Sequence, residues 1–180
     1  EQALINKEID LACITFTEGQ QNPDFSYIGN VKEEIVLGVP ASHPLAYLAG
    51  KNSAERLPEV DLCLFKDAQF LLATPETKSS DIEAEIFRTA GFRPKVLYTS
   101  SGSKTRIRTL KAQLACAFFP AFYIDPEAPV VYFTVKPHIC WYSCVAYRKG
   151  SYLSVPELVL IDLIRKYNAR VSNFKSIIQD

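Results

Sequence analysis

Short apolar runs rich in Ile, Val, Phe and Tyr alternate along this chain with segments of helical periodicity, and this order constrains the fold more than any other feature. Most of the runs are followed by turn-forming residues. Strands that alternate with helices are typical of an α/β sheet with helical crossovers. The sequence therefore predicts an α/β fold with strands at residues 8–16, 34–39, 69–74, 95–100, 130–135 and 140–147.

Two helices are predicted from their start signals. Ser80 and Glu83 form a capping-box pattern ahead of an apolar stripe, and Gly91 supplies a left-handed stop after it. Ser154 and Glu157 repeat the capping-box pattern near the end of the chain. We therefore expect one helix to begin at each of these serines.

The ends of the helices are predicted from the same rules. The last helix is expected to finish near Arg165 and Lys166, because basic side chains favour the final turn. A further helix is expected from about Ser103 to Ala115, where leucine and isoleucine recur at helical spacing. Beyond it, Pro120 is expected to stop any regular element in the apolar run 116–123.

The composition excludes several classes of protein. The 180 residues are 48% hydrophobic, which suits one domain or two small lobes with a real core. Twenty Lys and Arg residues balance twenty Asp and Glu residues, so the chain has no overall positive field with which to hold nucleic acid. The apolar runs are shorter than the roughly 18 residues of a membrane span, and the first residues do not resemble an export signal. We expect a cytoplasmic protein without membrane association, and the lack of Met predicts a fragment of a longer chain.

The five cysteines are widely spaced and lie mostly in apolar runs, which favours reduced thiols used as small hydrophobic side chains. Cys140 and Cys144 form a CxxxC pattern. On a strand these two residues would lie ~13 Å apart, well beyond the ~4.4 to 6.8 Å between Cα atoms that a disulfide allows. Core packing is therefore preferred to a redox or metal site.

The two histidines give no sign of a catalytic or metal centre. His43 precedes Pro44, a pattern typical of a turn that enters a short helix with proline at its first position. His138 lies far away in the sequence, and neither histidine has a nearby partner of the kind that catalysis or metal binding requires. We expect both to be structural or surface residues, and we expect no catalytic residue, metal or cofactor.

Two turns rich in hydroxyl groups follow strand candidates, at residues 74–80 and 100–105. The second does not match a phosphate-binding loop or an SxxK acylating site. It does lead into a helix N-terminus, where free N–H groups and the helix dipole attract anions. A solvated basic helix face is the alternative. In an open α/β sheet, both turns are expected to face the same ligand crevice.

The order of motifs resembles the effector-binding domain of LysR-type transcriptional regulators. The resemblance covers nearly the whole chain and is carried by "LINKEIDLACI", "VKEEIVLGVPASHPLA", "FLLATPETKSSDIEAEIFRTAGFRPKV", "LKAQLACAFFPAFYI" and "VAYRKGSYLSVPELVLIDLI". It implies a two-lobed fold like the type II periplasmic binding proteins, with two crossing strands near 34–36 and 147–149. Lobe one is expected at residues 1–34 and 148–180, and lobe two at 35–147. The first strand and helix of lobe one, and the DNA-binding region, are expected upstream of this chain.

The resemblance also implies an effector site in the cleft between the lobes. Its residues are expected to be Thr15, Thr74, Ser101, Ser103, Pro120 and Phe122. Hydroxyl groups would orient a small-molecule effector, and Phe122 would cover it. Basic residues near the second turn suggest an anion such as a carboxylate, although a neutral ligand suits the same hydroxyls.

The resemblance further implies a homodimer that becomes a tetramer at full length, and DNA binding only through a helix-turn-helix domain outside this chain. Effector binding would control transcription by changing the geometry of that attached domain. The alternative is a solute-binding protein of similar fold that serves a transporter. An enzyme on the same scaffold is a third interpretation, but no paired acid and base or activated nucleophile supports it.

Overall fold

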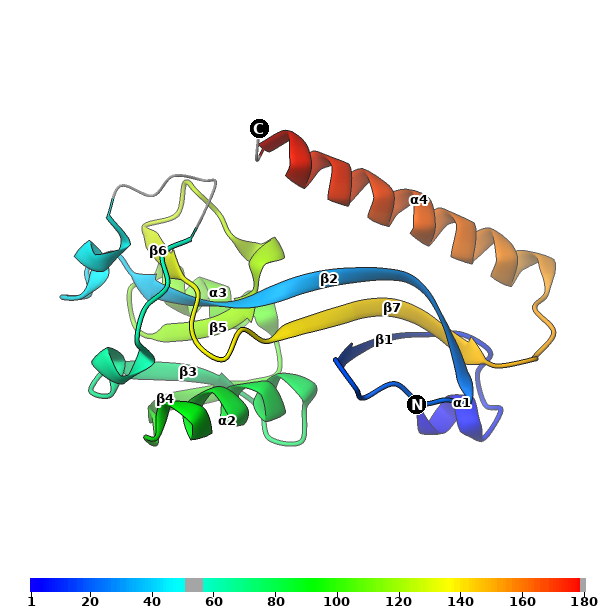
Figure 1. Ribbon diagram of the computed structural model, residues 1–180, viewed down its shortest axis with the longest axis horizontal. Coiled ribbons are helices and arrows are strands. Elements are labelled where there is room, and N and C mark those ends of the chain that lie inside the picture. Colours follow the sequence, from blue (N-terminus) through cyan, green and yellow to red (C-terminus); the bar gives the residue numbers. More distant parts are fainter. Residues whose placement is uncertain (51–56, 179–180) are drawn as a thin grey trace. The chain divides into compact units, whose positions relative to one another are not determined.

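The computed structural model describes residues 1–50 and 57–178 (Figure 1). The chain divides into two compact units. Unit one consists of Glu1–Glu33 and Cys140–Asp180, and unit two of Glu34–Ile139. The chain therefore passes from unit one to unit two once, within a single long strand, and returns once.

Unit one is built around an antiparallel pair of strands. β1 (Ala12–Thr17) pairs with β7 (Cys140–Arg148) in a register that runs from Ala12 opposite Ala146 to Thr17 opposite Trp141 (Figure 1). A small core joins Leu4, Phe25 and Ala146. The other elements of this unit are the single turn α1 (Gln2–Ile5), the first part of β2 (Phe25–Pro40) and the long helix α4 (Val155–Ile178).

Unit two holds a mixed sheet covered by helices. The end of β2 pairs antiparallel with β5 (Cys116–Pro120) and with β6 (Val130–Phe133). β3 (Gln69–Ala73) lies between β5 and β4 (Lys95–Ser100) and runs parallel to both. The helical elements are η1 (Ala46–Ala49), η2 (Leu62–Phe65), α2 (Lys78–Ala90), α3 (Ser103–Lys111) and η3 (Ala121–Tyr123).

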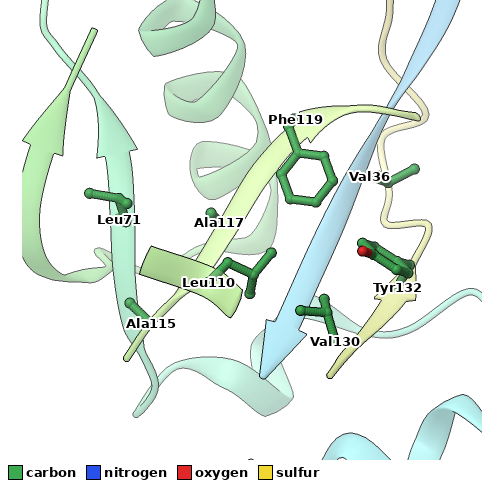
Figure 2. Packing of buried hydrophobic residues seen from close by; sticks show 8 residues of the cluster. All are labelled: Val36, Leu71, Leu110, Ala115, Ala117, Phe119, Val130 and Tyr132. Atoms are coloured by element: carbon green, nitrogen blue, oxygen red, sulfur yellow. The ribbon is translucent and has the colours of Figure 1, made fainter. Parts of the chain in front are cut away.

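The core of unit two forms where α3 packs on the sheet (Figure 2). All five residues of β5 are buried, so this strand lies at the centre of the sheet. Phe119 packs edge-to-face on Tyr132, with 6.0 Å between the ring centroids. The cluster contains Val36, Leu71, Leu110, Ala115, Ala117, Phe119, Val130 and Tyr132.

The predicted α/β fold is confirmed, and most of the predicted strands are present. The strand at 95–100 has the predicted bounds, and those at 69–74, 130–135 and 140–147 differ by no more than two residues at an end. The strand at 8–16 begins only at Ala12, and the strand at 34–39 is the second half of the longer β2. The first half of β2 was missed because it carries Asn, Gly, Lys and Glu instead of an apolar run.

The run before Pro120 forms a strand that was not among the predicted ones, and this strand ends at Pro120, where the sequence predicts a stop. Cys116–Pro120 form the central strand β5, and Pro120 pairs with Ile35 of β2 at its last position. A proline is tolerated there because only one residue of the ladder lacks an N–H donor and the strand ends with it.

The predicted start of α2 was also wrong. Its N-cap is Thr77, whose side chain accepts a hydrogen bond from the Ser80 N–H, and the Ser80 hydroxyl lies 3.3 Å from the Thr77 N–H as its acceptor. Ser80 is therefore the third residue of the helix rather than its cap. Glu83 takes no part in the capping box and is buried instead. Gly91 ends the helix in the left-handed conformation, with φ 75°, as predicted.

Two other helix ends differ from the predictions. α3 stops at Lys111, and the positive φ of 64° at Gln113 is incompatible with a continued right-handed helix. Leu114, which was expected on its apolar face, is 61% exposed. α4 continues to Ile178, so Arg165 and Lys166 lie in its middle. Its predicted start is supported by the Glu157 carboxylate, which accepts a hydrogen bond from the Ser154 N–H.

Strand β7 contains the CxxxC pattern, as the strand prediction requires, and all five cysteines are free thiols. Its pairing with β1 places residues 140–147 in unit one, whereas the predicted lobe boundary lies at 147/148. The predicted lobes are defined by the family resemblance and the two compact units by packing, so the lobe division stays a prediction. No helix among the described residues has the length and apolar character needed to cross a bilayer.

Candidate functional site

Three parallel strands of unit two end at one edge of the sheet. β3 pairs with β4 in a register that places Ala73 opposite Ser100, and with β5 in a register that places Leu71 opposite Ala117. Because parallel strands present their carboxyl ends at the same edge, the turns that follow them are neighbours. Five of the six predicted effector-binding residues lie in these strand ends and turns: Thr74, Ser101, Ser103, Pro120 and Phe122.

The turn before α2 uses its hydroxyl groups internally. The Thr77 hydroxyl donates to the Thr74 carbonyl at 2.8 Å and accepts from the Ser80 N–H at 3.2 Å. The Ser80 hydroxyl donates to the Thr77 carbonyl at 2.8 Å. The N-terminus of α2 is therefore capped by its own side chains, and among the described residues of this turn the half-buried Thr74 and Ser79 keep hydroxyls for another partner.

The turn before α3 is open by comparison. Its N-cap is Gly102, which has no side chain to accept a hydrogen bond from the first helical N–H groups. The N–H groups of Ser103 and Lys104 therefore lack a helical acceptor. In the part of the chain that the structure describes, the hydroxyls of Ser101 and Ser103 make no hydrogen bond. This turn offers donors without acceptors, which suits an anion.

Fewer unpaired positive charges lie near the open turn than the four basic residues of the sequence suggest. Lys111 forms an ion pair with Asp125 at 2.5 Å. Arg106 is buried and paired with an acidic residue. Lys104 and Arg108 are exposed and form no ion pair with a described residue. The positive potential at this turn therefore comes from these two side chains and from the helix dipole.

A buried ion pair lies behind the turns. Arg106 Nη1 donates to Glu83 Oε1 at 2.7 Å and to the Phe118 carbonyl at 3.3 Å. Glu83 Oε2 accepts from the Ala73 N–H at 2.7 Å. Burial raises the pKa of Glu83 to about 7, although the Ala73 N–H and Arg106 both favour its ionised form.

Sequence reasoning missed this pair, although a signal was present. Glu83 stands on the apolar face of α2, three and four residues before the buried Ile86 and Phe87. Arg106 stands on the apolar face of α3, four residues before Leu110. A charge of opposite sign on the buried face of each of two helices indicates a buried pair, since an isolated buried charge is costly.

Aromatic side chains border the end of β5. Phe122 is 48% exposed and contacts Tyr123 edge-to-face, with 5.5 Å between ring centroids. Tyr123 packs against the core cluster of unit two. The exposed ring at the end of β5 and the unused hydrogen-bond donors at the start of α3 give this edge of the sheet both apolar and polar groups for a small molecule.

Thr15, the sixth predicted residue, belongs to unit one and is not part of the group described above. It lies on β1 opposite Ser143, and Thr17 lies two residues further on, opposite Trp141. Side chains two apart on a strand share a face, so these four residues form one polar face of the strand pair. The buried indole N–H of Trp141 has no hydrogen-bond partner among the described residues.

The two histidines make structural contacts. His43 packs on Phe65 with 5.4 Å between ring centroids, and burial lowers its pKa. Its predicted turn is present, but Pro44 precedes η1, which begins only after Leu45. His138 lies between Glu34 and Glu59. Among the described residues, no group of three or more His, Cys, Asp or Glu side chains could hold a metal ion.

Unit one contains a surface hollow of about 310 Å³ lined by Ile5, Asp24, Phe25, Arg148 and Lys149. It contains none of the predicted effector-binding residues. Arg148 is already engaged, because it donates to the carbonyls of Leu4 and Ile9 and forms an ion pair with Asp10. We assign this arginine to the packing of α1 and not to a ligand.

The fold is similar to solved structures of LysR-family proteins. The effector-binding domain of QuiR in complex with shikimate matches with a TM-score of 0.71 and 18% identity, over 94% of this chain and 76% of that one. The C-terminal domain of a probable LysR-family regulator from Rhodococcus sp. RHA1 matches with a TM-score of 0.69 and 21% identity, over 91% and 77%. The regulatory domain of CcmR from Synechocystis PCC6803, in complex with 2-PG, matches with a TM-score of 0.69 and 16% identity, over 93% and 77%.

No curated protein sequence matches the chain. The model of the LysR substrate-binding domain family matches residues 1–169, which is nearly the whole chain. This match agrees with the motif order noted in the sequence and with the α/β fold of both units. The chain belongs to the family of LysR substrate-binding domains, the ligand-sensing domains of LysR-type transcriptional regulators.

Proposed function

We propose that this domain binds a small anionic effector at the open N-terminus of α3 and thereby controls a DNA-binding domain elsewhere in the full-length regulator. The observation that carries the proposal is the difference between the two hydroxyl turns of unit two. α2 is capped by Thr77, whereas α3 begins at Gly102 with unsatisfied N–H groups and unused serine hydroxyls. The family assignment supports a regulator over a transporter-associated solute-binding protein.

The proposed ligand is a carboxylate or a phosphate ester. The N–H groups of Ser103 and Lys104 and the hydroxyl of Ser101 would hold the anionic group. Thr74, Pro120 and Phe122 would contact the rest of the molecule, and Thr15 of unit one stays a proposed effector-binding residue. Shikimate in the QuiR domain and 2-PG in the CcmR domain fit the same chemical class.

The remaining parts of the proposal concern the whole regulator. DNA would be bound by a helix-turn-helix domain, and the regulator would act in the cytoplasm, with this domain forming a homodimer and the full-length protein a tetramer. The effector would be released unchanged, because a sensing domain needs a difference in affinity between two states and no chemical step.

A ligand panel tests the proposal. Small carboxylates, phosphate esters and inorganic phosphate are added to the protein, and the thermal unfolding midpoint is recorded. A ligand at a hundred times its Kd contributes about 2.7 kcal/mol, which corresponds to a rise of roughly 5–10 °C for a chain of this size. Mass spectrometry of the recovered ligand then shows whether it was altered.

Substitutions locate the binding position. Ser103→Phe and Thr74→Phe place bulky side chains at the proposed site and are expected to abolish the ligand-dependent shift. Tyr152→Phe, on an 87% exposed residue of unit one, serves as the control. Unchanged ligand-dependent shifts in both site variants would rule out this position, and conversion of the ligand would favour an enzyme.

A further inference from the structure

The Glu83–Arg106 pair connects the three turns that carry the proposed effector site. Its two side chains are only 4% and 3% exposed. Glu83 holds the N–H of Ala73, the residue directly before Thr74. Arg106 holds the carbonyl of Phe118, two residues before Pro120.

Arg106 is also linked to the third turn through the helix, because it belongs to α3 and follows Ser103 by three residues. One ion pair thus bonds to the backbone of β3 and β5 while its arginine is part of the helix that begins at the open turn. A change in the position of either side chain would move the ends of β3 and β5 relative to the first N–H groups of α3.

Stability alone is a poor explanation for this pair. Removing two charges from water costs about as much as their attraction returns, and shape-matched apolar residues are often equally stable. The hydrogen bonding is also incomplete, since Arg106 Nε is buried without a partner among the described residues. An apolar pair could not orient the backbone groups, because only directional hydrogen bonds hold the Ala73 N–H and the Phe118 carbonyl in one geometry.

We infer that Glu83 and Arg106 are positioning residues, which set the geometry of the effector-binding turns from behind without touching the ligand. This inference rests on the proposed function. It assigns to a buried pair the role that outer-shell hydrogen bonds have in other binding sites, where they orient the groups that contact the ligand.

The test replaces both charges at once, so that no unpaired charge is left in the core. The variant is Glu83→Met with Arg106→Met. The matched control is Glu85→Met with Arg88→Met, a pair of the same residue types on the exposed side of α2, joined at 2.6 Å. Urea unfolding measures the stability of both variants.

Two further measurements read the geometry of the site. The first is the Kd for inorganic phosphate, followed through the amide signals of Ser103 and Lys104 in NMR spectra. The second uses no ligand and measures the hydrogen-exchange rates of the Thr74, Ser101 and Phe122 amides. The first depends on the proposed anion site and the second does not.

The inference predicts near-normal stability in the core variant together with phosphate binding weakened by roughly tenfold, as when outer-shell supports are removed elsewhere. Exchange at all three amides is expected to become faster, and the surface control should change neither measurement. Normal phosphate affinity and normal exchange in a folded core variant would overturn the inference. A wild-type protein whose Ser103 and Lys104 signals ignore phosphate would instead refute the proposed anion site, and the exchange rates would still decide the role of the pair.

If the core variant does not fold, Arg106→Lys serves in its place. Lysine keeps the positive charge but replaces the planar fork of donors with a single nitrogen on a flexible stem. It is expected to preserve the fold and to reproduce the faster exchange at the three amides. Exchange at the wild-type rates would refute the inference.

Discussion

Replacing Gly102 by aspartate places an anion of the protein's own at the start of α3. Gly102 has φ −91° and ψ 113°, the extended conformation that an N-cap residue adopts. From this position the Asp carboxylate can accept hydrogen bonds from the N–H groups of the first helical turn. These are the groups that the proposed effector would use, so the substitution is expected to stabilise the protein and to exclude the ligand.

The size of both effects follows from the local geometry. Aspartate gains a few tenths of a kcal/mol over glycine as a cap and about 0.3–1 kcal/mol from the helix dipole. A Cβ at Gly102 would lie 3.3 Å from Thr105 Oγ1, a tight contact that takes back part of this gain. The net stabilisation is about 0.5–1 kcal/mol, or roughly 1–4 °C in the thermal midpoint. Two anions about 4 Å apart near a surface repel by about 4 kcal/mol, so phosphate affinity should fall by at least about a hundredfold.

The assay is thermal unfolding with and without phosphate, together with a phosphate titration followed by NMR. Gly102→Ala is the control, because it adds the same Cβ without an acceptor. It is expected to lower stability by up to about 1 kcal/mol and to leave phosphate affinity close to that of the wild type. If the Asp variant gains stability and still binds phosphate as the wild type does, the start of α3 is not the anion site.

Three further predictions concern the framework of unit two. In Gly38→Ala the added Cβ would lie 2.5 Å from Leu110 Cδ2 and 2.8 Å from the Phe119 ring. We therefore expect the free energy of unfolding, measured in urea, to fall by roughly 1–3 kcal/mol. An unchanged urea midpoint would contradict this packing. Thr77→Ala removes the cap of α2 and should cost about 1 kcal/mol by the same method, a loss that a cap at Ser80 would not produce. The carboxylates on either side of His138 raise its pKa, so its stabilising effect is complete below its ordinary pKa of 6.5 and is lost as the pH rises through the raised value. His138→Gln should therefore destabilise the protein most near pH 6. Burial lowers the pKa of His43, so an NMR titration should find a higher pKa for His138 than for His43.

Local sequence signals predicted a helix end correctly where the sequence offered a single candidate residue for it. Gly91 ends α2 as expected, because glycine adopts a positive φ at no steric cost. The start of the same helix was ambiguous, since Thr77 and Ser80 are both good caps. The structure uses Thr77, and Glu83 instead accepts a hydrogen bond from the Ala73 N–H at the end of β3. Capping rules consider only neighbours in sequence and could not foresee that contact.

Strand prediction failed where burial depends on distant residues. Cys116–Pro120 end in proline, yet pairing with β2 and β3 makes this run the buried centre of the sheet. The first half of β2 has the opposite character, because its polar residues give no apolar signal and its pairing within the sheet defines it as a strand. Both cases depend on strand neighbours that are far apart in the chain.

The sequence by itself determined the α/β class, the positions of most elements and the two hydroxyl turns, because these depend on residue spacing and local backbone preference. The order of its motifs also identified the family. Only the tertiary structure decided what the turns can do. Pairing of β3 with β4 and β5 places the strand ends at one edge, the Thr77 cap closes one turn, and Gly102 leaves the other open. The pair that supports them joins residues 23 apart in sequence, and hydrogen bonds over such a separation exist only once the sheet and its helices have packed together.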